Sequence, residues 1–74
     1  MDNVDRIRAL REDSDWNQTK VANMLNVSQE TYSAYELRKA RIPVDSLIIL
    51  AKAYNVDMNY ICGVSDEIKP YPKR

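Results

Sequence analysis

The side chains best suited to recognise a ligand lie in one run, residues 29–34, which reads Gln-Glu-Thr-Tyr-Ser-Ala. Gln29 carries an amide that both donates and accepts hydrogen bonds, whereas the carboxylate of Glu30 only accepts them. An amide of this kind matches N6 and N7 of adenine, and a carboxylate matches N4 of cytosine. A polar face on any surface helix has the same composition, so the run by itself leaves recognition and simple solvation both open.

A basic cluster follows this run and consists of Arg38, Lys39 and Arg41. Three such cations can neutralise phosphates, although a solvated loop has the same composition. The residues that catalysis or metal binding would require are missing. The chain has no histidine, and its one cysteine, Cys62, has neither a base to activate it nor further ligands for a metal. We therefore expect no enzyme, no metal site and no cofactor.

Length, charge and cysteine content bound the class of protein. Seventy-four residues make one small domain. Eleven Lys and Arg balance eleven Asp and Glu, and a net charge of zero is a weaker electrostatic footprint than most DNA-binding domains carry. A single cysteine cannot form an internal disulfide, which favours a reducing cytosol. No apolar run approaches the roughly eighteen residues of a membrane span, and the first residues do not resemble a signal peptide.

Helices must position these groups, because the chain is rich in helix-forming residues and lacks strand-type alternation over roughly its first sixty residues. We expect an all-α bundle of five helices with a short extended C-terminal tail. The expected helices span residues 4–14, 18–25, 29–37, 44–54 and 58–62.

Two apolar faces meet at a sharp corner between residues 18 and 37. Asn26 stands between the faces, where a residue with positive φ is needed, and asparagine tolerates that conformation better than most residues other than glycine. Ser28 is placed to cap the helix that follows. The faces consist of Val21, Ala22 and Leu25 before the corner, and of Val27, Tyr32 and Tyr35 after it.

Helical periodicity also sorts side chains between core and solvent. It places Ile7 in the core and Arg6 in solvent on the first helix, and it includes Val44 in the buried stripe of the fourth. Trp16 is expected to fill the gap between the first two helices. Residues 64–74 carry two prolines and no helical period, which indicates a tail or linker, either mobile or docked as an extended strand.

Several blocks of residues together match a known pattern. They are Ile7-x-x-Leu10-Arg11, Gln18 with Val21-Ala22 and Leu25, Val27-Ser28, Tyr32, Tyr35-Glu36, Ile42 to Leu47 with Leu50-Ala51, and Val56-Asp57 with Tyr60-Ile61 and Gly63. On these blocks the chain resembles the helix-turn-helix domain of lambda-type phage repressors, Cro and the small bacterial regulators of the Xre class. The second half resembles the version found in Gram-positive bacteria and their prophages.

The resemblance implies a compact lambda-repressor-like domain over residues 1–63, with the helix-turn-helix motif at 18–37 and a tail or linker at 64–74. It implies a sequence-specific regulator of transcription, a repressor, that binds double-stranded DNA at a palindromic operator as a homodimer. Such a protein works in the bacterial cytoplasm, at the nucleoid.

The resemblance also assigns roles to individual residues. In this family the second helix lies across the DNA backbone and the third enters the major groove. It implies base contacts by Gln29, Glu30, Thr31, Ser33 and Ala34. It implies backbone contacts by Asn17, Gln18, Ser28, Arg38, Lys39 and Arg41. It implies a partly buried structural ion pair between Arg11 and Glu36.

The chain departs from the family pattern at three turns, where glycine is usual and this sequence has Asp15, Asn26 and Arg38. Asp and Asn accept a positive φ at modest cost, but a long side chain rarely does. Either the turn after the third helix is built differently, or that helix continues past Leu37.

A second class of function is a protein-interaction module on the same fold, an adaptor or antitoxin-like partner with weak or no DNA binding. The zero net charge, Glu30 and the non-glycine turn at Arg38 favour it.

For the DNA-binding homodimer, a two-fold contact is expected among the surplus apolar residues, although each fits the core equally well. These residues are Ile48, Ile49, Met58 and Ile61. The tail, with Ile68 and Tyr71, could exchange between subunits or lead to an effector domain.

Overall fold

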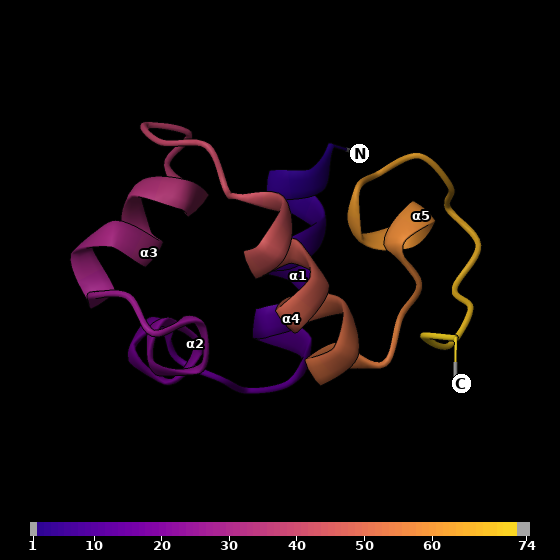
Figure 1. Cartoon of the computed structure of the whole chain (residues 1–74), viewed down its shortest axis with the longest axis horizontal. Helices are drawn as coiled ribbons and strands as arrows, with labels where there is room; N and C mark the ends of the chain where they lie inside the picture. The colour runs from indigo at the N-terminus through magenta and orange to yellow at the C-terminus, as the bar shows by residue number, and fades with distance from the viewer. Residues whose placement is uncertain (1, 73–74) are drawn as a thin grey trace.

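Five helices account for the regular structure of this chain, of which the computed structural model describes residues 2–72 (Figure 1). No strand occurs in that range. The helices are α1 (Asn3–Asp13), α2 (Gln18–Leu25), α3 (Gln29–Glu36), α4 (Val44–Tyr54) and α5 (Met58–Ile61). The predicted all-α class is confirmed, and each predicted helix corresponds to an observed one with ends that differ by at most one residue.

Side-chain caps start four of the helices. Asp2, Asn17, Ser28 and Asp57 each accept a hydrogen bond from the backbone N–H three residues further on. These bonds satisfy donors that a helix start otherwise leaves free. α4 has no side-chain cap and follows Pro43, whose fixed φ suits a helix start.

All five helices end at a residue in the left-handed conformation: Asp15, Asn26, Arg38, Asn55 and Gly63, with φ between 55° and 79°. In each case the next amide donates to a carbonyl five residues earlier, which closes the helix and reverses the chain. Arg38, at φ 62°, therefore forms the turn in which the family usually has glycine. The alternative that the third helix continues past Leu37 is wrong.

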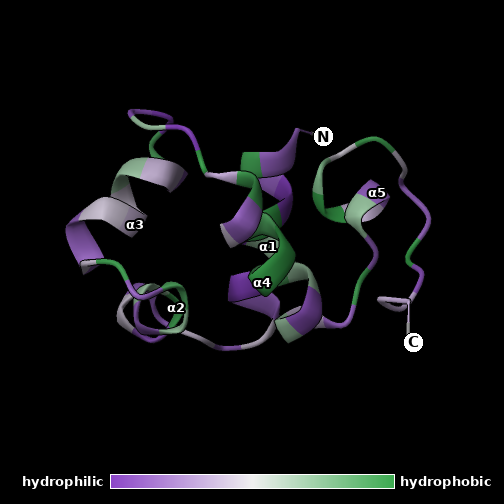
Figure 2. Ribbon diagram, in the orientation of Figure 1, coloured by the Kyte–Doolittle hydropathy of each residue, from purple (hydrophilic) through white to green (hydrophobic). Residues whose placement is uncertain are grey.

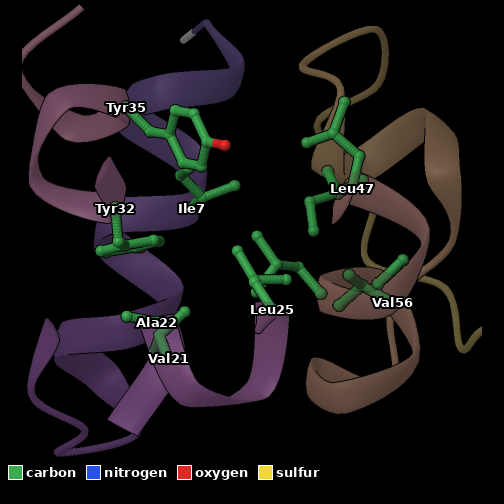
Figure 3. Packing of buried hydrophobic residues seen from close by; sticks show 11 residues of the cluster. Ile7, Val21, Ala22, Leu25, Tyr32, Tyr35, Leu47 and Val56 are labelled. Atoms are coloured by element: carbon green, nitrogen blue, oxygen red, sulfur yellow. The ribbon is translucent and has the colours of Figure 1, made fainter. Parts of the chain in front are cut away.

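The core lies between α1, α2 and α3 on one side and α4 and α5 on the other. In Figure 3 the side chains of Ile7 and Tyr32 lie opposite Leu47 and Val56, with Leu25 in the space between. Ile7 and Tyr32 are completely buried, and burial of such a side chain contributes about 1.5–3 kcal/mol. Figure 2 shows strong hydrophobic colouring in the middle of α4, whereas α3 is hydrophilic at its start and pale over the rest of its length. The buried residues are Ile7, Val21, Ala22, Leu25, Tyr32, Tyr35, Leu47, Leu50, Ala51, Val56 and Ile61.

Two of the predicted orientations are wrong. Arg6 is 4 % exposed rather than solvated, because its guanidinium stacks 3.9 Å from the ring centre of Tyr60. It also donates to the backbone carbonyls of Tyr60 and Ser65. Val44 is 62 % exposed rather than buried, although it begins the same helix turn in which Ser46 and Leu47 are buried.

The C-terminal tail is docked against the domain over its described part. The N–H of Asp57 donates to the carbonyl of Lys69 at 2.8 Å, and the N–H of Tyr71 donates to the side chain of Asn55 at 3.2 Å. Arg6 adds an ion pair of 2.8 Å to Asp66. Of the two alternatives for the tail, the structure therefore shows the docked one, in irregular form. Residues 73–74 and residue 1, which belong to the predicted ranges, lie outside the described residues.

Candidate nucleic-acid interface

α2 and α3 meet at the corner that the sequence predicted. Asn26 has φ 58°, and the N–H of Val27 donates to the carbonyl of Ala22 at 3.0 Å. This turn brings the start of α3 next to the start of α2, where the side-chain amide of Gln29 donates to that of Gln18 at 2.7 Å. The first turns of both helices consequently share one surface (Figure 1).

An ion pair beneath this surface ties α3 to α1. The guanidinium of Arg11 donates to the carboxylate of Glu36 twice, Nε to Oε2 at 2.7 Å and the terminal nitrogen to Oε1 at 3.0 Å. Arg11 also donates to the carbonyl of Trp16, at the connection between α1 and α2. The two side chains are 13 % and 3 % exposed. This forked, mostly buried contact fixes the angle of α3 against the rest of the domain.

Glu36 sets the orientation of both glutamine amides. Its carboxylate can only accept, so Gln18 must turn its NH2 group toward it, at 3.2 Å. The oxygen of Gln18 then faces outward, and Gln29 must present its own NH2 group to it. The result is a continuous chain of hydrogen bonds from Arg11 in the interior to Gln29 on the surface.

The protonation of Glu36 follows from these contacts. Burial alone would raise the pKa of its carboxyl, but the interactions with Arg11, then with Tyr32 and Gln18, outweigh burial and hold the pKa below its ordinary value of 4.5. The same pair raises the pKa of Arg11, chiefly through its hydrogen bond to Glu36. Glu36 is therefore an anion near neutral pH and keeps the amide chain in one orientation.

The five candidate base-reading residues divide by exposure. Gln29, Glu30 and Thr31 are exposed on the first turn of α3, whereas Ser33 and Ala34 are half-buried further along it. All five belong to α3, so the structure brings them together on one helix.

The candidate backbone contacts at the helix starts combine side chains with free amides. Asn17 uses its side-chain oxygen to cap α2 through the N–H of Lys20 at 2.8 Å, which leaves its NH2 group for another acceptor. The backbone amides of Gln18 and Thr19 have no acceptor among residues 2–72. Free N–H groups at the start of a helix attract anions. Thr19 was not among the sequence candidates.

Ser28 is occupied by its own helix. Its oxygen accepts from the N–H of Thr31 at 3.1 Å, and its hydroxyl donates to the Thr31 hydroxyl at 2.9 Å. The structure thus gives Ser28 a capping role, and the hydroxyl of exposed Thr31, which accepts from Ser28, can still donate its proton.

The basic cluster is divided by its partners. The structure places one terminal nitrogen of Arg38 at 2.9–3.0 Å from carboxylate oxygens of Asp2 and Asp5, so one side of this half-exposed guanidinium is already paired with acids. Lys39 and Arg41 are exposed, and neither forms an ion pair within the described part of the chain. Sequence reasoning did not predict the contact of Asp2 and Asp5 with Arg38, which joins residues more than thirty positions apart, at 36 and 33.

The four candidates for a subunit contact differ in accessibility. Ile61 is completely buried in the core of the single chain. Ile48 and Met58 are half-buried, and Ile49 is 41 % exposed. Sequence reasoning missed Val44, which is the most exposed apolar side chain of α4.

Other kinds of site were sought among the described residues. Residues 2–72 contain no group of three or more His, Cys, Asp or Glu side chains that could hold a metal ion. No helix in the same range is long and apolar enough to cross a membrane.

The fold and this surface define a helix-turn-helix protein, and comparison with known families agrees. A family model described as helix-turn-helix matches residues 7–61, and the chain belongs to that family. The predicted resemblance is thereby confirmed.

Two curated relatives come from Bacillus subtilis (strain 168). The chain is 32 % identical over 69 residues to the uncharacterised HTH-type transcriptional regulator YobD, a match that covers 93 % of this chain and 62 % of the relative. It is 25 % identical over 71 residues to the HTH-type transcriptional regulator AnsR, which covers 96 % of this chain and 61 % of that protein. The chain thus spans about three fifths of the length of these relatives. No solved structure gives a significant match.

Proposed function

We propose that this protein binds double-stranded DNA and regulates transcription, with α3 in the major groove and α2 across the backbone. One observation carries the proposal. The buried ion pair between Arg11 and Glu36 orients the amide of Gln18, and Gln18 in turn orients the amide of Gln29 on the exposed start of α3. A surface amide that merely faced solvent would need no such support. Membership in the helix-turn-helix family and the names of both relatives support the same conclusion.

The chemistry of Gln29 fits adenine. One proton of its NH2 group is used by Gln18, which leaves a second proton and the carbonyl oxygen for a base. Adenine offers N7 as an acceptor and N6 as a donor on its major-groove edge, and a glutamine amide pairs with both. Other candidate side chains of α3 contact neighbouring bases. Glu30 accepts from cytosine, and Thr31 presents a free hydroxyl proton.

We place phosphate contacts on two sides of α3. At the start of α2, the free amides of Gln18 and Thr19 and the NH2 group of Asn17 face one phosphate. Beyond the end of α3, the exposed side chains of Lys39 and Arg41 neutralise the other strand. Ser33 and Ala34 are half-buried on α3, and their short side chains reach only a base or phosphate that lies close to the helix.

One such domain covers little DNA, so a homodimer on a palindromic operator is the functional unit that we propose, with half-sites about 34 Å apart. The exposed part of α4, with Ile49 and Val44, is its contact surface. Residues 1–63 form the DNA-binding unit and residues 64–74 a C-terminal extension. We place the protein in the bacterial cytoplasm at the nucleoid, as a repressor.

The proposal is tested by binding to a labelled random duplex over a salt series from about 50 to 300 mM. Each phosphate contact contributes about 0.9 to the slope of log affinity against log salt, so a steep line is expected. Lys39→Ala should reduce that slope, whereas Lys69→Ala should not, because Lys69 lies on the tail at the far side of the molecule from α3 (Figure 1). A flat line, or no binding at the lowest salt, would contradict DNA binding.

A protein-interaction module is the second candidate, and the exposure of apolar side chains favours it. Leu37 is 59 % exposed, and Val44, a few residues later, is 62 % exposed. If no DNA binding is found, these residues mark the surface on which a partner protein would be sought.

A further inference from the structure

Arg38, just beyond the end of α3, is paired with two acids near the start of α1. A terminal nitrogen of Arg38 lies 3.0 and 2.9 Å from the two carboxylate oxygens of Asp2, and 2.9 Å from one oxygen of Asp5. All three side chains are about half exposed. Arg38 is 36 and 33 positions away from Asp2 and Asp5 in the sequence, so only the fold brings these residues together.

The backbone fixes the place from which Arg38 reaches these acids. Arg38 has φ 62°, in a turn that is closed by hydrogen bonds from the amides of Arg38 and Lys39 to the carbonyls of Tyr35 and Ala34. The turn leads into residues 38–42, which face Asp2, Asn3 and Val4 across an open cavity of about 580 Å³. Lys39 and Arg41 line the same cavity. Asp2 therefore lies beside the whole basic segment that we assign to phosphate contact, and Asp5 contacts that segment through Arg38.

Carboxylates and phosphates compete for the same guanidinium protons, because both present paired anionic oxygens at similar spacing. While Asp2 and Asp5 bind Arg38, one cation of the basic segment is already neutralised. A phosphate that approaches this segment must displace the acids, and it also meets their negative charge. The hydrogen bond from the Asp5 backbone N–H, followed by that from Arg38, lowers the pKa of the Asp2 carboxyl below its ordinary value, so Asp2 stays ionised. The competition is therefore present at any pH near neutrality.

We propose that Asp2 and Asp5 are affinity-setting residues that hold Arg38 away from the DNA backbone as an intramolecular substitute for phosphate. The inference rests on the proposed DNA binding. It assigns the N-terminal acids a role beyond capping α1, and it makes Arg38 a reserve contact that is used only when the acids release it. With Arg38 paired, the affinity for any DNA sequence is lower, which agrees with a net charge of zero. Discrimination between operators then depends on α3.

The test compares variants that remove charge with little change of shape. Asp2→Asn with Asp5→Asn removes both competitors, and asparagine at position 2 still caps α1 through its side-chain oxygen. Binding to the random duplex should tighten roughly fivefold near 0.1 M salt, and the salt slope should steepen by about 0.9 for each subunit, since each freed arginine gains one phosphate. Adding Arg38→Gln to this variant should return the slope to its native value.

A matched control removes two acids elsewhere. Glu12→Gln with Glu67→Gln breaks only two loose surface pairs, of 3.9 and 3.8 Å, and changes the net charge equally. If this control tightens binding as much as Asp2→Asn with Asp5→Asn, the effect is general charge and the inference is overturned while DNA binding stands. The same follows if Arg38→Gln leaves the gain in place, because the acids then act by repulsion alone. If no variant binds DNA at any salt concentration, the proposed function fails together with the inference.

Discussion

The carboxylate of Glu36 joins three helices, because it lies on α3 and accepts hydrogen bonds from Arg11 on α1 and from Gln18 on α2. At the scale of single residues, Glu36 therefore serves both the stability of the fold and the recognition of DNA that we propose. The ion pair is buried, so removing one partner leaves the other charge without compensation. The amide chain to Gln29 also loses the acceptor that orients it.

Glu36→Ala should therefore lower the free energy of unfolding by about 3 kcal/mol, since it leaves Arg11 mostly buried and unpaired. DNA affinity should fall with it. Urea denaturation and duplex binding measure the two effects. Glu30→Ala, on an exposed position of the same helix, is the control and should change stability by less than about 0.5 kcal/mol. Lost affinity at an unchanged melting temperature would show that the pair is not structural.

Acid should weaken the fold through the same residue. The pKa of Glu36 is below its ordinary value of 4.5 in the folded protein, so its contribution is fully present above that value and is lost as pH falls through the folded-state pKa. Unfolding free energies measured from pH 7 downward should decline below about pH 4.5. The decline should be shallower in Glu36→Gln, which cannot titrate. Equal acid dependence in the two proteins would place the linkage elsewhere.

At the scale of elements, one turn geometry ends every described helix, and four of the five turns use a residue other than glycine. Asparagine and aspartate at these positions could be predicted from sequence, because their short polar side chains tolerate a positive φ. Arg38 could not, since local propensity opposes it. Its turn is held by bonds to Tyr35 and Ala34 and by a side chain whose partners lie more than thirty positions away, at 33 and 36 residues.

The turn at the corner of the motif gives the prediction at this scale. Asn26→Ala should destabilise the domain by about 1 kcal/mol, because alanine pays the full cost of a left-handed conformation. Asn26→Gly should be neutral or slightly stabilising. Thermal unfolding measures both. A destabilising glycine together with a tolerated alanine would mean that the side chain of Asn26, and not its backbone, makes the corner.

At the scale of the whole molecule, sequence reasoning predicted the helices and most of the core, because hydrophobic periodicity reports directly on burial. It failed at Arg6 for the same reason, since periodicity treats every arginine as solvated. The partners that bury Arg6 are Tyr60, Ser65 and Asp66, which are 54 to 60 positions distant. The chain of amides from Glu36 to Gln29 likewise depends on geometry between helices, which no local pattern contains.

The central claim is that the starts of α2 and α3 face DNA, and an amide-resolved NMR titration with duplex DNA tests it most directly. We expect the largest shift changes at Gln18, Thr19, Gln29 and Lys39, with the tail at residues 65–72 unchanged. Changes concentrated on α5 and the tail, with the amides of α2 and α3 unaffected, would contradict the account.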